Sequence, residues 1–193
     1  MWRFAFLLLA LAMAPALYPA SAASLPAPQT APGVPQQLDK LFKQLPKAGS
    51  ADAARPIETQ ILFLFSRSGS PSVDLLMGRA LDAAKAGEKD LAEQLVESIT
   101  DIAPGYAEGW HVRGQIAQAA DNDEAAIAYF SKALALNPRH FQACSELAEV
   151  LMEYGDKKQA LQYMRKAYAL DPYLPGLDKQ IDKVSRDVEG EKI

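Results

Sequence analysis

Apolar residues recur along this chain at intervals of three or four, separated by short polar breaks, and this spacing predicts helices. The first such run, near residues 36–46, consists of Leu38, Leu41, Phe42 and Leu45. The second, which precedes a Ser-Gly-Ser-Pro break at residues 68–71, consists of Ile57, Ile61, Leu62, Leu64 and Phe65. Residues 47–53 contain Gly49 and Ser50 and predict a break between these two helices.

The remaining pattern repeats every 34 residues. The residues that mark this period are Pro104, Pro138 and Pro172, together with Ala92, Ala126 and Ala160 and with Val96, Phe130 and Met164. A period of this length predicts a stack of helix–turn–helix units in place of a single independent globule. We place the repeats at residues 73–106, 107–140 and 141–174, followed by an amphipathic capping helix at 175–188 and a tail at 189–193.

Each predicted repeat contains a turn between its two helices. Gly87, Asp121 and Gly155 lie 17 positions before the marker prolines, where a left-handed backbone favours Gly and sometimes Asp or Asn. The residues that we predict to cap the second helices are Asp90, Asn122 and Asp156. The proline then stops each second helix because it cannot donate a backbone hydrogen bond to the preceding turn.

Small residues recur where the helices of a pair must approach closely. One position of the first helix holds Ala80, Gly114 and Ala148, and one position of the second helix holds Ala92, Ala126 and Ala160. A further second-helix position holds Ala133 and Ala167, although the first repeat has Ile99 there. Large apolar residues surround these small ones, as interlocking helix layers require.

The N-terminus has the pattern of a secretory signal. Arg3 precedes an apolar stretch at residues 4–14, and Ala20-Ser21-Ala22 is a small-x-small cleavage site. We therefore expect a signal peptide at 1–22, with cleavage after Ala22 and a periplasmic or secreted product. An uncleaved N-terminal anchor is the alternative. Residues 23–36 are rich in proline and predict a semi-extended linker, and residues 37–72 form an N-terminal helical segment.

Composition narrows the range of functions. A net charge of -4 without a basic stripe argues against nucleic-acid binding. The one cysteine, Cys144, cannot form a disulfide within the chain, and in an amphipathic helix we expect it to be a buried apolar residue; a functional thiol is the alternative. His111 and His140 supply no metal set with Cys144, and Asp121-Asn122-Asp123 lacks the glycine and distant glutamate of a calcium loop. We expect no cofactor, no metal and no small-molecule substrate.

The repeat pattern resembles the tetratricopeptide repeat (TPR) family, whose motif is a 34-residue helix pair. The repeat that carries most of this motif, at 107–140, contains Trp110, Gly114, Ala126, Phe130, Ala133 and Pro138. The resemblance covers residues 73–174. It implies an all-α fold, a right-handed α-solenoid of three helix–turn–helix repeats with N-terminal helices and a C-terminal capping helix.

Two further stretches, at residues 106–110 and 138–141, are similar to a group of exported bacterial TPR proteins whose biochemical activity is not agreed. Where the family motif has leucine in the first helix, this chain has Arg79 and Arg113. We expect their aliphatic stems to pack while their charged heads reach solvent or a nearby carboxylate. The alternative is a pair of guanidinium groups that bind a ligand.

The resemblance also implies that the first helices line a concave face on which a partner segment lies. The exposed positions of this face correspond to Asp74, Met77, Leu81, Glu108, His111, Gln115, Gln118, Gln142, Ser145, Glu149 and Met152. Some family members clamp a peptide carboxylate with Lys, Asn and Arg, but the matching positions here hold Met77, Leu81, Gln142 and Glu146. A basic or amide-rich extended peptide, or an amphipathic helix, fits this face better. The alternative is that these are solvated positions without a function.

These observations predict a periplasmic adaptor or assembly scaffold that binds an unidentified protein partner. A periplasmic chaperone that holds envelope proteins is the second hypothesis. A small-molecule enzyme would need a convergent acid–base or metal site, and no catalytic motif is evident.

Overall fold

The structure, a computed structural model, describes residues 33–190. The predicted signal peptide, its cleavage site and residues 23–32 of the predicted linker lie outside this range, as do the last three residues of the tail. The described residues contain nine α-helices and no strand. None of these helices has both the length and the apolar character needed to span a bilayer.

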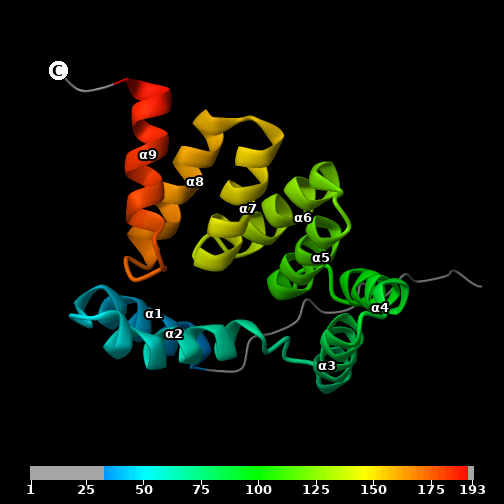
Figure 1. Cartoon of the computed structure of the whole chain (residues 1–193). Coiled ribbons are helices and arrows are strands. Elements are labelled where there is room, and N and C mark those ends of the chain that lie inside the picture. The colour runs from blue at the N-terminus through cyan, green and yellow to red at the C-terminus, as the bar shows by residue number, and fades with distance from the viewer. Residues whose placement is uncertain (1–32, 191–193) are drawn as a thin grey trace, which may run out of the picture.

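The helices follow one another with short connections. They are α1 (Val34–Gln44), α2 (Ala51–Phe65), α3 (Pro71–Ala86), α4 (Lys89–Ile102), α5 (Ala107–Ala119), α6 (Asp123–Leu136), α7 (Phe141–Tyr154), α8 (Lys157–Leu170) and α9 (Leu177–Glu189), with a 3-10 turn, η1 (Leu45–Lys47), after α1. Helices α3 to α8 form three antiparallel pairs that stack into a curved solenoid, which α9 closes at one end. Figure 1 shows α1 and α2 as a hairpin lying across one edge of this curve.

The predicted turn chemistry is confirmed at all three intra-repeat turns. Gly87 and Gly155 have left-handed backbones with φ of 79° and 97°, and Asp121, with φ of 55°, is the one non-glycine residue among the described residues with a positive φ. Asn122 caps α6 by accepting from the Ala125 N–H, and Asp156 caps α8 in the same way. The prediction that Asp90 caps α4 is wrong. The N-cap is Glu88, which occupies the repeat position of Asn122 and Asp156.

Two predicted boundaries in the N-terminal segment are also wrong. Helix α1 begins at Val34, inside the predicted linker, because a proline in the first helical turn lacks only an N–H that the helix does not use. The predicted break at residues 47–53 is shorter, because the Ser50 side chain accepts from the Ala53 N–H and starts α2 at Ala51.

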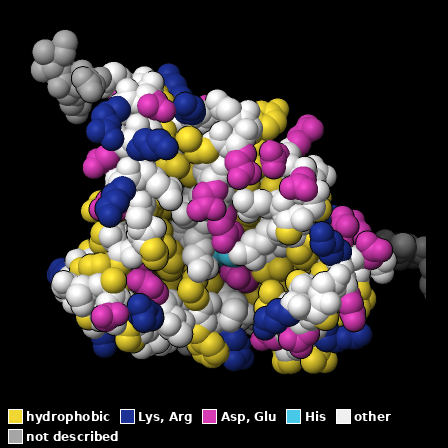
Figure 2. Space-filling model, in the orientation of Figure 1, with side chains coloured by type: hydrophobic (Ala, Val, Ile, Leu, Met, Phe, Trp, Pro, Cys, Tyr) yellow, Lys and Arg dark blue, Asp and Glu magenta, His cyan; other side chains and the backbone are white. Residues whose placement is uncertain are grey.

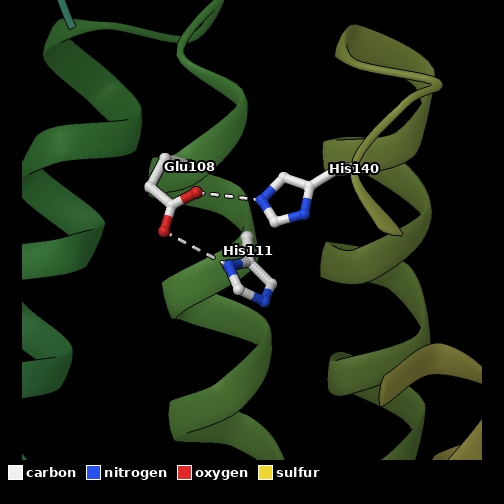
Figure 3. Close-up of side chains that lie close together, drawn as sticks. All are labelled: Glu108, His111 and His140. Carbon is white, nitrogen blue, oxygen red and sulfur yellow. Dashed lines mark hydrogen bonds and ion pairs between the residues drawn. The ribbon is translucent and has the colours of Figure 1, made fainter. Parts of the chain in front are cut away.

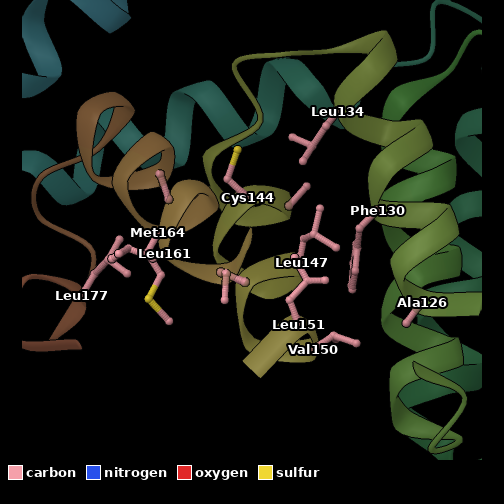
Figure 4. Packing of buried hydrophobic residues seen from close by; sticks show 14 of the residues in the cluster. Ala126, Phe130, Leu134, Cys144, Leu147, Val150, Leu151, Leu161, Met164 and Leu177 are labelled. Atoms are coloured by element: carbon pink, nitrogen blue, oxygen red, sulfur yellow. The ribbon is translucent and has the colours of Figure 1, made fainter. Parts of the chain in front are cut away.

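Side-chain sizes are complementary where the paired helices cross. Phe130 of α6 is fully buried against Gly114 of α5, and a Cβ atom on Gly114 would lie only 2.6 Å from the phenyl ring. The equivalent positions of the other pairs hold Ala80 with Val96 and Ala148 with Met164, so a smaller second-helix residue accompanies a larger first-helix residue. Figure 4 shows the largest of the resulting cores, in which Cys144 is fully buried as predicted.

The same compensation holds between neighbouring repeats. Ile99 of α4, where the other repeats have alanine, faces Gly109 of α5, and a Cβ atom on Gly109 would approach the Ile99 side chain to 3.0 Å. At the C-terminal end, α9 buries Leu177 and Val184 against the last repeat and exposes its charged side. This arrangement confirms the predicted polar-backed cap, which keeps the apolar face of the final repeat out of water.

The α1–α2 hairpin contacts the stack at the junctions between repeats. Tyr106 donates a hydrogen bond of 2.6 Å from its hydroxyl to the Ser66 carbonyl. The ring of His140, 34 residues later, lies 5.0 Å from the ring of Phe65. At the third junction the Tyr173 hydroxyl accepts from the Gly49 N–H at 2.8 Å. The hairpin therefore braces all three junctions along one edge of the solenoid.

The packing at Gly114 generates a stability prediction. Gly114→Leu should lower the free energy of unfolding by about 2 kcal/mol or more, because the added side chain must displace the buried Phe130 ring. Gly114→Ala combined with Phe130→Met, which reproduces the Ala148 and Met164 pair of the next repeat, should recover much of this loss. Urea denaturation followed by circular dichroism measures both effects.

Gly78 provides the matched control, because it lies within α3 with open space around its Cβ position. Gly78→Ala should stabilise the protein by roughly 0.5 to 1 kcal/mol through helix propensity alone. An unchanged denaturation midpoint in Gly114→Leu would mean that the two helices do not cross at this glycine.

Candidate functional site

The predicted groove residues occupy one side of α3, α5 and α7, but not all of them face solvent. Met77 and His111 are buried, with exposed fractions of 4% and 2%, which corrects the expectation that both are surface positions. Those that remain exposed or half-buried are Asp74, Leu81, Glu108, Gln115, Gln118, Gln142, Ser145, Glu149 and Met152. Figure 2 shows this face as a hollow with a histidine at its base and acidic side chains around it.

Asp74 holds the loop before α3 in place and is not a free groove carboxylate. Its Oδ1 atom accepts from the Ser68 backbone N–H at 2.9 Å and from the Ser68 hydroxyl at 2.6 Å. Its Oδ2 atom lies 3.3 Å from the Arg67 guanidinium. Beside this loop, Met77 and Leu81 line a hollow of about 620 Å³ between the end of α2 and α3.

A buried polar network joins α5 to α7 beneath the hollow (Figure 3). The two oxygens of Glu108 face one imidazole each, with Oε1 3.4 Å from His111 Nδ1 and Oε2 2.9 Å from His140 Nε2. The other ring nitrogen of His111 lies 2.7 Å from an oxygen of Glu146, which also accepts from the Gln115 amide at 2.9 Å. The network therefore connects two first helices and the N-terminal end of α7.

Hydrogen-bond geometry assigns different charge states to the two histidines. Both ring nitrogens of His111 face carboxylates, so both must carry protons and the ring is an imidazolium. The Nδ1 atom of His140 instead accepts from the Ala143 N–H at 3.2 Å, as the N-cap of α7. Because Nδ1 is an acceptor, the proton of His140 lies on Nε2, which donates to Glu108, and this ring is neutral.

The pKa shifts agree with this assignment. Burial opposes a charge on His111, but its hydrogen bonds to Glu108 and Glu146 prevail and raise its pKa to about 9. Burial also opposes ionisation of Glu108, but the hydrogen bonds from the two histidines prevail and lower its pKa to about 2. For His140, burial and the charge of His111 lower the pKa, although its bond to Glu108 acts the other way.

Glu108, His111 and His140 offer imidazole nitrogen and carboxylate oxygen, which are donor types that Zn²⁺ prefers. Their ligand atoms lie within 4.8 Å of one another. A metal on Nε2 of His140 would require the remaining proton to sit on Nδ1, where it would face the Ala143 N–H. The cap of α7 would then be lost. Each donor and acceptor in the network already has a partner, so its geometry favours a closed hydrogen-bond network over a metal site.

Sequence reasoning considered both histidines but missed their connection through Glu108. Two features of the sequence could have indicated this connection. Glu108 and His111 lie three residues apart on one helix, and His140 occupies the repeat position of Tyr106. Arg113, in contrast, behaves as expected. Its guanidinium binds Glu97 at 3.0 Å and Thr100 at 2.9 Å, and it lies over the rings of Trp110 and Tyr129. Arg79 is exposed.

The solvent-facing side of α7 carries a row of carboxylates formed by Glu146, Glu149 and Glu153, which we call the α7 acidic row. Burial raises the pKa of Glu149, and the charges of its two neighbours raise it further. Within residues 33–190, Glu149 and Glu153 form no ion pair with Lys or Arg. Figure 2 shows acidic side chains over α7 and basic ones over α9, where Lys179 and Lys183 are exposed.

The network generates a pH prediction. A group whose pKa is raised on folding stabilises the protein below its unfolded pKa, and this contribution is lost as pH rises through the folded pKa. For His111 the window runs from the unfolded value of 6.5 to about 9. The free energy of unfolding should therefore fall by about 2 to 3 kcal/mol across this window.

His111→Asn should remove most of this pH dependence, and Glu146→Gln should reduce it because one carboxylate still faces the ring. Urea denaturation at several pH values measures the slope for each protein. A wild-type free energy of unfolding that stays constant from pH 6.5 to pH 9 would contradict a charged His111.

Comparisons with known proteins agree with the repeat geometry. The family model described as Tetratricopeptide repeat matches residues 117–172. A TPR repeat-containing protein of Rhizobium etli is 27% identical over 157 residues, which cover 81% of this chain and 77% of the relative.

Three solved structures share the fold. The first TPR of Spaghetti (RPAP3), bound to an HSP90 peptide, has a TM-score of 0.57 at 17% identity and covers 61% of this chain and 93% of its own. The MamA protein has a TM-score of 0.57 at 17% identity, with 82% and 84% covered. The Yersinia enterocolitica chaperone SycD, in complex with a peptide of the translocator YopD, has a TM-score of 0.53 at 18% identity, with 62% and 92% covered. The three in-phase 34-residue helix pairs therefore have the tetratricopeptide repeat fold, and residues 117–172 match the tetratricopeptide repeat family.

Proposed function

We propose that this protein is a periplasmic adaptor or assembly scaffold that binds a segment of another protein on the concave side of α3, α5 and α7. The general role, a protein-interaction module, follows from the tetratricopeptide repeat fold. The compartment and the binding face are the finer part of the proposal. Export rests on the sequence of residues 1–22, which has the charged, apolar and small-residue regions of a secretory signal.

The observation that carries the proposed face is the α7 acidic row. Burial raises the pKa of Glu149 most, and the like charges of Glu146 and Glu153 on the same helix face raise it further. Some other surface carboxylates of the described residues are paired with a cation, for example Glu97 with Arg113 and Asp187 with Lys157. A partner that presents Lys or Arg would relieve the repulsion within the row, so binding there is favoured by charge complementarity.

Apolar groups on the same face favour an amphipathic partner segment. Met152 is half-buried at the edge of the α7 acidic row, and Met77 and Leu81 line the hollow beside α3. Methionine adapts its shape to different apolar side chains. A helix or extended peptide with basic and apolar residues on one side therefore matches the face better than a purely charged peptide does.

The relatives give limited support for a peptide partner. The structures of RPAP3 and SycD contain peptides of HSP90 and of YopD, respectively. SycD is described as a chaperone, so a holding function for unfolded envelope proteins is the second candidate. Two exposed apolar side chains, Leu75 of α3 at 68% and Phe63 of α2 at 58% exposed, favour this candidate because a holdase needs accessible apolar surface.

Charge reversal of the α7 acidic row tests the proposed face. Glu149→Lys combined with Glu153→Lys should lower partner recovery from envelope extracts by about tenfold or more, because the row would then repel a basic segment. Affinity capture with quantitative mass spectrometry measures recovery, and circular dichroism checks the fold. Glu108 is unsuitable for this test because it belongs to the buried network.

The matched control is Glu93→Lys with Glu124→Lys, which changes the net charge equally at exposed positions on second helices. This control should leave recovery unchanged. Equal loss in both double variants would indicate a general charge effect, and no loss in either would move the contact away from α7. Suppression of aggregation of several unrelated proteins, with no single retained partner, would favour the chaperone.

A further inference from the structure

The interface between the α1–α2 hairpin and the last repeat contains a carboxyl group that is poorly matched to its surroundings. The interface is mainly apolar, with Leu45 and Ile61 of the hairpin fully buried beside Phe141 of α7. Asp171, which directly follows α8, is also fully buried. Its Oδ1 atom accepts from the Tyr173 N–H at 3.0 Å, but its Oδ2 atom has no hydrogen-bond partner among the described residues.

The internal repeats show that the local turn does not need a charge at this position. The residues 34 apart are Ala103, Asn137 and Asp171. Asn137 makes the same turn, because its side-chain oxygen accepts from the Arg139 N–H at 3.2 Å. Asparagine therefore supplies the bond that Asp171 supplies, without an ionisable oxygen. The aspartate adds only a second oxygen, which is buried at the hairpin interface.

One charged group of the hairpin, Glu58 of α2, interacts with Asp171. Burial raises the pKa of the Asp171 carboxyl, although the N–H of Tyr173 acts against this shift. Burial also raises the pKa of Glu58, and the charge of Asp171 raises it further, while Arg55 lowers it. Two carboxyl groups that each disfavour the charge of the other bind a proton more readily as a pair than either does alone.

We propose that docking of the α1–α2 hairpin on the stack is proton-linked, so that a proton held by Asp171 and Glu58 tightens the hairpin and its loss loosens it. The proton removes an uncompensated negative charge from a mainly apolar interface. Groups with a raised pKa stabilise the docked state fully below their ordinary pKa and lose this effect as pH rises through the raised value. Docking should therefore weaken as pH rises above about 4.

Other titratable or charged groups also lie in the interface between the hairpin and the stack, and not all of them favour docking at low pH. His140, which contacts Phe65, has a lowered pKa, so its neutral form favours docking at higher pH. Asp39 of α1 forms an ion pair with Arg139 at 2.6 Å across the same interface. The net pH dependence of the wild type sums these effects. The difference between the wild type and a variant at position 171 isolates the contribution of Asp171.

Hydrogen exchange of the full-length protein, corrected for the intrinsic exchange rate at each pH, measures docking directly. Relative to wild type, Asp171→Asn should increase protection of α1 and α2 amides at pH 7.5 by more than about threefold. The difference should shrink as pH falls toward about 4, and amides of α5 and α6 should not differ. Asp171→Ala removes the turn bond at every pH, so it should lower protection without the convergence that Asp171→Asn shows.

A ratio of Asp171→Asn to wild-type protection that stays constant from about pH 4 to pH 7.5 would overturn the proposal and leave Asp171 with a structural role. If Asp171→Asn fails to fold, Glu58→Gln tests the same pair from the surface of α2. It should raise hairpin protection at pH 7.5 and leave it unchanged near pH 4. Equal protection in Glu58→Gln and wild type at both pH values would then exclude proton-linked docking.

Discussion

The stack depends on complementary side-chain sizes where helices cross, because a small residue on one helix makes room for a large residue on the other. Within a pair, Gly114 makes room for Phe130, and between pairs Gly109 makes room for Ile99. Both glycines lie on α5, which is therefore held closely by α6 on one side and by α4 on the other. Since a densely packed helix cannot rotate without opening cavities, this packing also fixes which residues of α5 point toward the concave side.

The fixed orientation of α5 makes the buried Glu108–His111–His140 network possible. Burying these groups is unfavourable unless each charge meets an opposite charge and each donor meets an acceptor. The network meets this condition only when α5 and α7 lie at one separation, because His111 bridges carboxylates from both helices. A buried network of this kind contributes to the specificity of one arrangement, in addition to its net stability.

Periodicity was sufficient to predict the fold but not the details of the candidate site. The 34-residue spacing of prolines and alanines predicts the helix pairs, because turn geometry and close helix packing select these residue types locally. The boundaries of α1, α2 and α4 differ because Pro35, Ser50 and Glu88 act at helix starts that apolar spacing does not mark. The site was harder to predict because burial of Met77 and His111 depends on neighbours from other helices and repeats, such as Val112 for Met77 and His140 for His111. The periodic pattern of the sequence does not show which side chains of other helices cover a given position.

The location of the hairpin core explains why it can respond separately from the solenoid. The described residues form three apolar clusters, two within the stack and a third between the hairpin and the inter-repeat junctions. The third cluster draws on the stack only through Phe141, Leu170, Tyr173 and Leu174. Loosening it would expose these junction residues but would leave the crossings at Gly109 and Gly114 intact. Because segments with fewer shared apolar contacts open at lower free energy, the hairpin is the part of the described chain best suited to change its position while the helix pairs keep their crossings.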